Sequence, residues 1–287
     1  MIEQKILQRQ LRALGCPGAS LTLIREKDGV GVYRAASGGR RMVLKYFEKE
    51  EYRREIDGYR LLAALGVPTP KVYAATKEAF LLEDIDASET LRLAREEDVQ
   101  DPTVLRAVAR WYRMLHEKGC GLSQAQRGTL YCEYDALTPE ALRQAALRSG
   151  TEDAPCWTAL CRALPKLHGL LADRGTTLVY NDFHHSNLIV ARAGGAAMMY
   201  DYNFLGLGLA ASDIANVCYG LAPAAAAAFR EAYGPIDPAQ EALARALEGP
   251  VALALAGKRA VWPRWADAIL AQAQDGTLEA RLRALEE

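Results

Sequence analysis

Hydrophobic residues in the first third of the chain form short runs separated by turn residues. Residues 21–24, 30–34 and 42–46 are rich in β-forming side chains, and Asp-Gly and Gly-Gly pairs separate them, which predicts strands joined by tight turns. Apolar side chains recur every three or four positions over residues 3–14 and 48–65, which predicts an amphipathic helix on either side of these strands.

Two more strands are expected over residues 71–75 and 79–85, after the Pro-containing segment that ends the second helix. The N-terminal third is therefore predicted to be a mainly antiparallel sheet with one inserted helix. Beyond residue 89 the chain consists mostly of stretches rich in Ala, Leu, Arg and Glu, which favour helices. These stretches cover residues 101–118, 138–148, 155–174, 222–233, 237–248 and 251–285.

One strand-rich region, residues 176–202, interrupts the helical part. We therefore predict an α+β protein with two lobes: a sheet lobe over residues 1–86 and a larger, mainly helical lobe over residues 87–287 that carries one small hairpin.

A polar loop within the strand-rich region carries the strongest chemical signal. Asp182 precedes Asn187 by five positions, and two short strands, residues 188–191 and 196–200, then return the chain to Asp201. Phosphoryl transfer uses a carboxylate to accept the proton of the attacking hydroxyl, and Asn and Asp oxygens to hold magnesium (Mg2+). The Asp–Asn spacing alone is a common chance pattern of turn residues. The hairpin and Asp201 favour the catalytic interpretation.

The sheet lobe supplies a second signal. Lys45 lies within an apolar strand, where a lysine needs a partner, and Glu55 follows ten positions later on the next helix. A strand lysine that bridges a helix glutamate and the phosphates of ATP is the arrangement found in kinases. The alternative is a lysine at the sheet edge and a solvated glutamate. The loop from Asp182 to Asn187 favours the kinase interpretation.

Two further segments are candidates for contacts with a nucleotide. Gly29 and Gly31 lie in an Asp-Gly-Val-Gly-Val stretch that could cover phosphates, although a plain hairpin explains these glycines almost as well. Glu83 and Ile85 lie at the lobe junction, where backbone groups could hydrogen-bond an adenine. Their position, and not their residue types, indicates this role.

Taken together, Lys45, Glu55, the loop from Asp182 to Asn187, Asp201 and residues 212–216 resemble the aminoglycoside phosphotransferase and choline kinase superfamily. The resemblance spans roughly residues 20–235. It implies a protein-kinase-like fold and the phosphorylation of small-molecule hydroxyls with ATP and magnesium.

The resemblance also implies roles for individual residues. Asp182 would be the catalytic base, and Asn187 and Asp201 would be the metal ligands. Lys45 would hold the phosphates and be positioned by Glu55.

Two further features concern the catalytic loop and its support. Asp213 resembles the structural Asp that braces the loop from the following helix, and Leu115-His116 resembles the pair that ends the family's long helix. The chain has Tyr180-Asn181-Asp182 where the family commonly has His-Gly-Asp. We expect this difference to change the hydrogen bonding behind the loop while the chemistry remains possible; the sequence leaves its effect on activity open.

Charge and cysteine content restrict the cellular context. The 35 basic and 36 acidic residues give a formal net charge of −1, which argues against a nucleic-acid or polybasic membrane-surface protein. The N-terminus has no secretion signal, and the longest apolar tract is too short to span a bilayer. The six cysteines form no Cys-x-x-Cys pair, which favours free thiols in a reducing cytoplasm.

The sequence leaves the phosphate acceptor open. Acidic and basic residues between positions 121 and 170 are mixed, which is not the acidic wall that a polycationic aminoglycoside requires. An aromatic cage for a choline-like cation could be built, although such side chains are more often core residues. The candidates are Tyr131, Tyr134, Trp157, Trp262 and Trp265. Whether the nucleotide is ATP or GTP, and the oligomeric state, are equally open.

The favoured function is therefore an ATP-dependent transfer of the γ-phosphoryl group to a hydroxyl of a small molecule. One alternative is a catalytically idle kinase-fold protein that binds a nucleotide. Antibiotic resistance is a rival within the enzyme class. A protein kinase is disfavoured because no Ala-Pro-Glu segment follows Asp201.

Overall fold

The computed structural model describes residues 2–285, which divide into two compact units. The first comprises the chain up to Leu115 together with Asp182–Leu205 and Gly220–Tyr233, and the second comprises His116–Asn181, Gly206–Tyr219 and the chain from Gly234 onwards. The division after residue 86 stays a prediction.

The first unit is built on a five-stranded antiparallel sheet of order β1-β2-β3-β5-β4. Its strands are β1 (Ser20–Lys27), β2 (Val30–Ser37), β3 (Arg40–Phe47), β4 (Val72–Ala75) and β5 (Ala79–Glu83). Asp28 and Gly29 both have positive φ, 55° and 84°, in the two-residue turn between β1 and β2. This is the conformation that an Asp-Gly hairpin turn requires, and the predicted turn is therefore confirmed.

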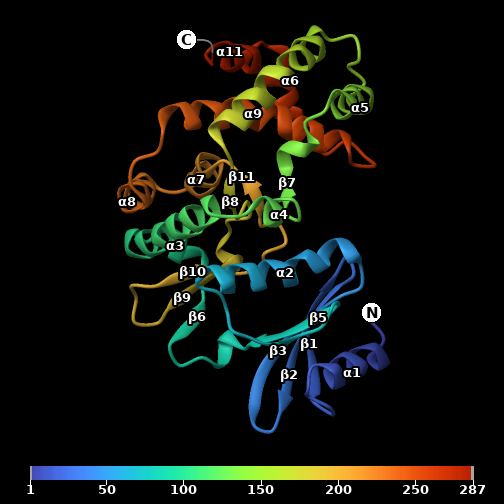
Figure 1. Cartoon of the computed structure of the whole chain (residues 1–287), viewed down its shortest axis with the longest axis vertical. Helices are drawn as coiled ribbons and strands as arrows, with labels where there is room; N and C mark the ends of the chain where they lie inside the picture. The colour runs from blue at the N-terminus through green and yellow to red at the C-terminus, as the bar shows by residue number, and fades with distance from the viewer. Residues whose placement is uncertain (1, 286–287) are drawn as a thin grey trace. The chain divides into compact units, whose positions relative to one another are not determined.

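Two helices pack beside this sheet (Figure 1). Leu7 and Leu11 of α1 (Gln4–Ala13) belong to a hydrophobic cluster with Tyr33 and Leu44 of the central strands. The helix α2 (Glu50–Leu65) ends at Gly66, which adopts the left-handed conformation at φ 72°. Both helices were expected from their apolar periodicity.

A second sheet of the first unit holds the strand-rich region. β9 (Leu188–Ala191) pairs with β10 (Ala197–Met199) in the predicted hairpin, and its other edge pairs with β6 (Leu91–Leu93). The 3-10 helices η1 (Ile85–Ala87), η2 (Glu96–Gln100) and η4 (His185–Asn187), and the helix α8 (Pro223–Tyr233), complete this unit with the start of α3 (Pro102–Cys120).

The second unit is mainly helical around one small sheet of order β7-β11-β8. Its strands are β7 (Tyr131–Cys132), β8 (Thr177–Val179) and β11 (Gly206–Gly208). Its helices are α4 (Gln124–Arg127), η3 (Glu133–Ala136), α5 (Pro139–Ser149), α6 (Pro155–Arg174), α7 (Ala210–Cys218), α9 (Pro238–Gly257), α10 (Ala266–Gln274) and α11 (Thr277–Arg283).

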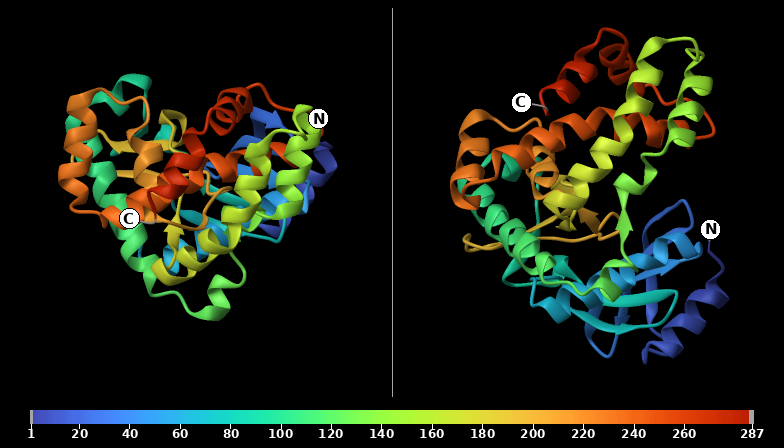
Figure 2. Two further views of the ribbon diagram at one scale, coloured as in Figure 1. Left: turned by 90° about the horizontal axis from the view of Figure 1, so that it is seen from above. Right: turned by 45° about the horizontal axis from the view of Figure 1, so that its top comes forward.

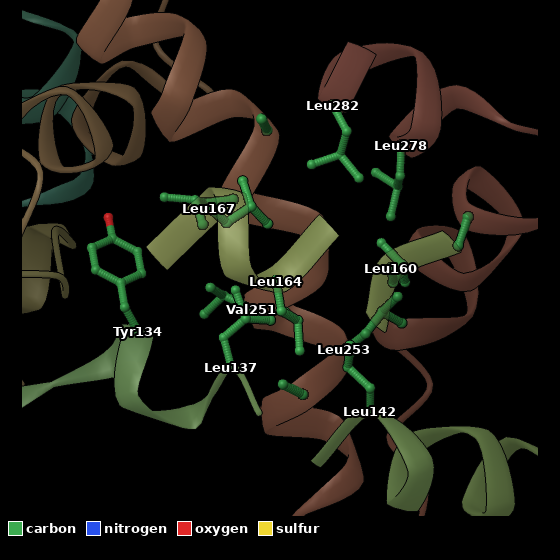
Figure 3. Packing of buried hydrophobic residues seen from close by; sticks show 14 of the residues in the cluster. Tyr134, Leu137, Leu142, Leu160, Leu164, Leu167, Val251, Leu253, Leu278 and Leu282 are labelled. Carbon is green, nitrogen blue, oxygen red and sulfur yellow. The ribbon is translucent and has the colours of Figure 1, made fainter. Parts of the chain in front are cut away.

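Leucines and other apolar side chains of α5, α6, α9 and α11 form one continuous core in this unit. Figure 3 shows Leu160 and Leu164 of α6 beside Val251 and Leu253 of α9. The right-hand view of Figure 2 shows α6, in yellow-green, crossing α9, in orange.

The helix-favouring stretches over residues 237–248 and 251–285 are joined across residues 249–250. Gly249 and Pro250 lie inside α9, which continues to Gly257. A Cβ at Gly249 would come within 2.6 Å of Leu278, so the glycine allows α11 to pack closely, and tertiary packing outweighs the helix-breaking tendency of the Gly-Pro pair.

Among the residues that the structure describes, no helix is long and apolar enough to cross a membrane.

Candidate active site

A buried ion pair joins the sheet to α2. Lys45 of β3 is 7% exposed, and its Nζ lies 2.9 Å from Oε1 and 2.7 Å from Oε2 of Glu55, which is fully buried. Burial raises the pKa of Glu55, and the charge of Lys45 opposes this shift. Burial alone would lower the pKa of Lys45, but the attraction of Glu55 and then Asp201 raises it, so the lysine carries its charge. The strand–helix pair predicted from the sequence is therefore present.

Asp201 joins this pair from the end of the hairpin. Its Oδ1 lies 3.1 Å from Lys45 Nζ, and its side chain remains 33% exposed. The backbone of Asp201 has φ 64°, a left-handed conformation that few residues other than Gly, Asn and Asp adopt. The turn aims this carboxylate back toward β3.

We expect Glu55→Ala to lower the free energy of unfolding by about 3 kcal/mol, the lower end of the range for breaking a buried ion pair, because Asp201 still contacts Lys45. Urea unfolding measures this change. Glu51→Ala, on the exposed face of the same helix, is the matched control and should change stability by less than about 0.5 kcal/mol. Equal stability of the two variants would contradict the importance of the pair.

Asp182 and Asn187 are joined by a direct hydrogen bond. Asn187 Nδ2 donates to Asp182 Oδ2 at 2.8 Å and to the Asp182 carbonyl oxygen at 3.1 Å. Burial, and then repulsion by the Asp201 carboxylate, raises the pKa of Asp182 to about 6, although the Asn187 bond opposes the shift. The structure thus gathers Asp182, Asn187 and Asp201 in one unit.

The oxygen donors of this group fit magnesium. The Asn187 amide nitrogen is turned toward Asp182, and its Oδ1 has only a 3.5 Å contact from Ser186 Oγ. Together with the partly exposed Asp201 carboxylate, this is a hard-oxygen set of few ligands, as magnesium uses when phosphates complete its coordination. Within residues 2–285, no group of three His, Cys, Asp or Glu side chains could hold a metal ion.

A fully buried carboxylate in the second unit binds the backbone just before Asp182. Asp213 of α7 accepts hydrogen bonds from Tyr180 N at 2.6 Å and from Asn181 N at 2.8 Å. His116, which is also buried, places its Nε2 3.1 Å from Asp213 Oδ2. Asn181 itself has φ 64°, so Asp213 holds a strained backbone in place.

The contact of His116 with Asp213 was not expected from the sequence. The only sequence feature that drew attention to His116 was the resemblance of Leu115-His116 to the pair that ends the family's long helix.

The two candidate glycines have structural explanations of their own. Gly29 occupies the left-handed turn described above, and its carbonyl accepts a hydrogen bond from Glu48 N at 2.8 Å. A Cβ at Gly31 would come within 2.6 Å of Ile2 and Tyr33 side-chain atoms, so a larger residue there would displace these side chains. Their contact with phosphates stays a prediction.

The segment at the end of β5 is fixed by an unexpected charge cluster. Asp84, almost fully buried, accepts hydrogen bonds from Arg34 Nε at 3.1 Å and from Arg41 Nε at 2.9 Å. In the flanking residues, the Glu83 N–H donates to the Lys71 carbonyl, and the Ile85 carbonyl accepts from Ser88 N. The role of Glu83 and Ile85 in holding an adenine stays a prediction. It would involve the Glu83 carbonyl and the Ile85 N–H, because their other backbone groups are bonded within the protein.

The second unit contains a cavity of about 380 Å³. It is lined by Glu133, Tyr134, Asn181, Ser212, Ala215, Asn216, Tyr219, Ala244, Arg245, Leu247, Glu248, Val251, Ala252 and Leu255. Asn181 immediately precedes Asp182 in the chain. The cavity therefore opens onto the backbone that Asp213 holds.

Most of the candidate cage aromatics lie elsewhere. Trp157 and Tyr134 belong to the hydrophobic core, and only Tyr134 also lines the cavity. The Trp262 indole donates to Asp267 Oδ1, and Trp265 packs against the Arg259 guanidinium. These aromatics form no cage around this cavity.

The structure is similar to solved kinases and phosphotransferases of low sequence identity. A choline/ethanolamine kinase family protein from Mesorhizobium loti has a TM-score of 0.67 at 17% identity, with 98% of each chain covered. The choline kinase LicA from Streptococcus pneumoniae has a TM-score of 0.64 at 15% identity, covering 96% of this chain and 99% of that one. The ADP-bound aminoglycoside phosphotransferase APH(2'')-Ib has a TM-score of 0.65 at 13% identity, with 99% of both chains covered.

These likenesses confirm the predicted α+β, protein-kinase-like fold. A model described as the phosphotransferase enzyme family matches residues 27–247, more than half of the chain, and the chain therefore belongs to that family. The resemblance found in the sequence is thus confirmed. No curated protein sequence matches the chain.

Proposed function

We propose that this protein transfers the γ-phosphoryl group of ATP to a hydroxyl of a small molecule. The observation that carries the proposal is the group of five side chains in the first unit, in which Lys45 contacts both Glu55 and Asp201 and Asp182 is bonded to Asn187. A protein that only binds a nucleotide has no chemical need for Asp182.

Lys45 binds the phosphates of the nucleotide, and Glu55 fixes the position of the ammonium group. Asn187 Oδ1 and the Asp201 carboxylate would hold magnesium, which neutralises charge on the phosphates when bound. Membership of the phosphotransferase family and likeness to an ADP-bound phosphotransferase support a nucleotide as donor.

Asp182 accepts the proton of the attacking hydroxyl. The hydroxyl oxygen forms a bond to the γ-phosphorus, the bond from that phosphorus to the bridging β–γ oxygen breaks, and ADP leaves. The hydrogen bond from Asn187 Nδ2 orients the Asp182 carboxylate. Its pKa of about 6 leaves it deprotonated at neutral pH and basic enough to take the proton as the bond forms.

The acceptor occupies the cavity of the second unit. Its lining includes Asn181, next to the proposed base, and it lies within the volume range of small-molecule sites, roughly 300–1,000 Å³. A cavity at the low end of that range favours a compact acceptor. Likeness to choline and ethanolamine kinases in fold is consistent with a small alcohol.

A magnesium-dependent assay with ATP or GTP tests this function against a panel of hydroxyl compounds: ethanolamine, choline, sugars, amino sugars and spectinomycin. Stoichiometric formation of nucleoside diphosphate and phosphorylated acceptor is expected with at least one member. Nucleotide binding with no transfer to any acceptor would instead support the catalytically idle kinase-fold alternative.

We expect Asp201→Asn to weaken magnesium-dependent nucleotide binding on the order of 10- to 100-fold, the equivalent of losing one charged ligand at about 1.4–2.8 kcal/mol. Calorimetric titration with and without magnesium measures this change. Binding without magnesium should change far less. An equal loss in both conditions would place Asp201 outside the metal site.

A further inference from the structure

One carboxylate in the cavity has no partner. Glu133, the first residue of η3, is half-buried and lines the cavity. Within the part of the chain that the structure describes, its side chain makes no hydrogen bond and no ion pair. Removing a carboxylate from water costs free energy unless the charge is paired or hydrogen-bonded.

The surroundings of Glu133 make its charge unfavourable in the free protein. Burial, and then the charge of Asp213, raise the pKa of the Glu133 carboxyl. A bound cation that donates hydrogen bonds would offset both effects, because it supplies the missing charge and fills the empty acceptor positions.

The other walls favour such a cation over a quaternary ammonium. Quaternary ammonium groups have no N–H donor and bind best against several aromatic faces. Tyr134 and Tyr219 are the cavity's aromatic side chains; the Tyr134 hydroxyl is bonded to Ser212, and Tyr219 is 88% exposed. The remaining lining is aliphatic or polar except for Arg245 and Glu248, whose side chains are exposed, so Glu133 is the half-buried charged group of the cavity.

We propose that Glu133 is the specificity-determining residue of this cavity and selects alcohols that carry a protonated amine with at least one N–H donor. This inference rests on the proposed function for the reaction itself. The ammonium group donates to the Glu133 carboxylate, in the cavity whose lining also includes Asn181.

A methylation series tests this selection in the full-length protein. The acceptors are ethanolamine, its N-methyl and N,N-dimethyl derivatives, choline and ethylene glycol, with glucosamine and glucose as a larger pair. We expect kcat/KM to fall most sharply between the dimethyl compound, which keeps one N–H, and choline, which has none. The loss should be on the order of 10- to 100-fold, as for a hydrogen bond between charged groups.

Glu133→Gln should remove the difference in kcat/KM between the dimethyl compound and choline. Glu133→Asp should restore part of the preference. Asp135→Asn is the control: it removes the same charge from an exposed side chain of η3 that does not line the cavity. Its kcat/KM values across the methylation series should match those of the unaltered protein.

Thermal unfolding separates recognition from folding. Because Glu133 has no partner, Glu133→Gln should keep or raise the melting temperature, whereas replacing a carboxylate that stabilises the fold would lower it.

A preference for choline or ethylene glycol would overturn the inference and leave the proposed function intact. The same holds if the difference in kcat/KM between the dimethyl compound and choline survives in Glu133→Gln. Failure of every N–H acceptor to bind by calorimetry would also overturn it. Binding of these acceptors with loss of affinity in Glu133→Gln, but no transfer, would support the inference and contradict the kinase activity.

Discussion

Replacing Asp182 by Asn is expected to lower kcat by roughly 10²- to 10⁴-fold, the contribution typical of a positioned general base. An amide has nearly the same shape but cannot accept the proton of the attacking hydroxyl. Nucleotide affinity should stay within about threefold, because Lys45 and Asp201 remain in place. Steady-state kinetics and calorimetric titration with the nucleotide measure the two effects.

The same substitution should not destabilise the fold. Burial and the nearby Asp201 carboxylate raise the pKa of Asp182 above its usual value, so the charged form is unfavourable in the folded protein. Removing the charge should leave the melting temperature unchanged or higher. Asp173→Asn, an exposed carboxylate on α6, is the control and should change neither kcat nor stability. Full turnover in Asp182→Asn would show that another group is the base.

Asp213→Ala is expected to reduce the free energy of unfolding by about 2–6 kcal/mol. Two backbone N–H groups, those of Tyr180 and Asn181, lose their acceptor, at about 1–3 kcal/mol each when left unsatisfied in the interior. This is a large share of the roughly 5–15 kcal/mol that stabilises a typical domain. Denaturant unfolding gives the value.

Activity should fall together with stability in Asp213→Ala, because the strained backbone at Asn181 loses the group that holds it. Asp213→Asn keeps one oxygen acceptor and should lie between Asp213→Ala and the unaltered protein in both measurements. Asp173→Ala again serves as the control. A stable, fully active Asp213→Ala would mean that the loop needs no support from α7.

The geometry of the loop that carries Asp182 and Asn187 was predictable because its parts are close in sequence. Asp182, Asn187 and Asp201 are connected by one hairpin, so local turn rules bring them together. Lys45 was identifiable because a charged side chain interrupts an apolar strand. Its partner Glu55 required both a prediction of the next helix and knowledge of how kinases place this pair.

Interactions between distant segments escaped prediction. His116 and Asp213 are 97 positions apart, and nothing in either local pattern indicates the other. The pairing of Arg34 and Arg41 with Asp84 depends on strand order, which hydrophobic periodicity does not specify. The cavity is lined by residues of several separate segments, so its unpaired Glu133 was visible only in three dimensions.

Short elements were missed for a related reason. β6, β7 and β11 have two or three residues each, too few for an alternating pattern to be recognised. Each is a strand only because a partner elsewhere in the chain supplies its hydrogen bonds.

The pairing of β6 with β9 has a consequence for the order of folding. Leu91 faces Ala191, so this edge closes only after about a hundred intervening residues have been synthesised. During translation, β6 emerges before its partner strand β9 and is at first unpaired. Lys45 and Asp201 belong to the same unit, which is complete only after β9 has been synthesised. The group of five side chains is thus completed late: a nascent or truncated chain that ends before the hairpin contains Lys45 and Glu55 but lacks Asp201.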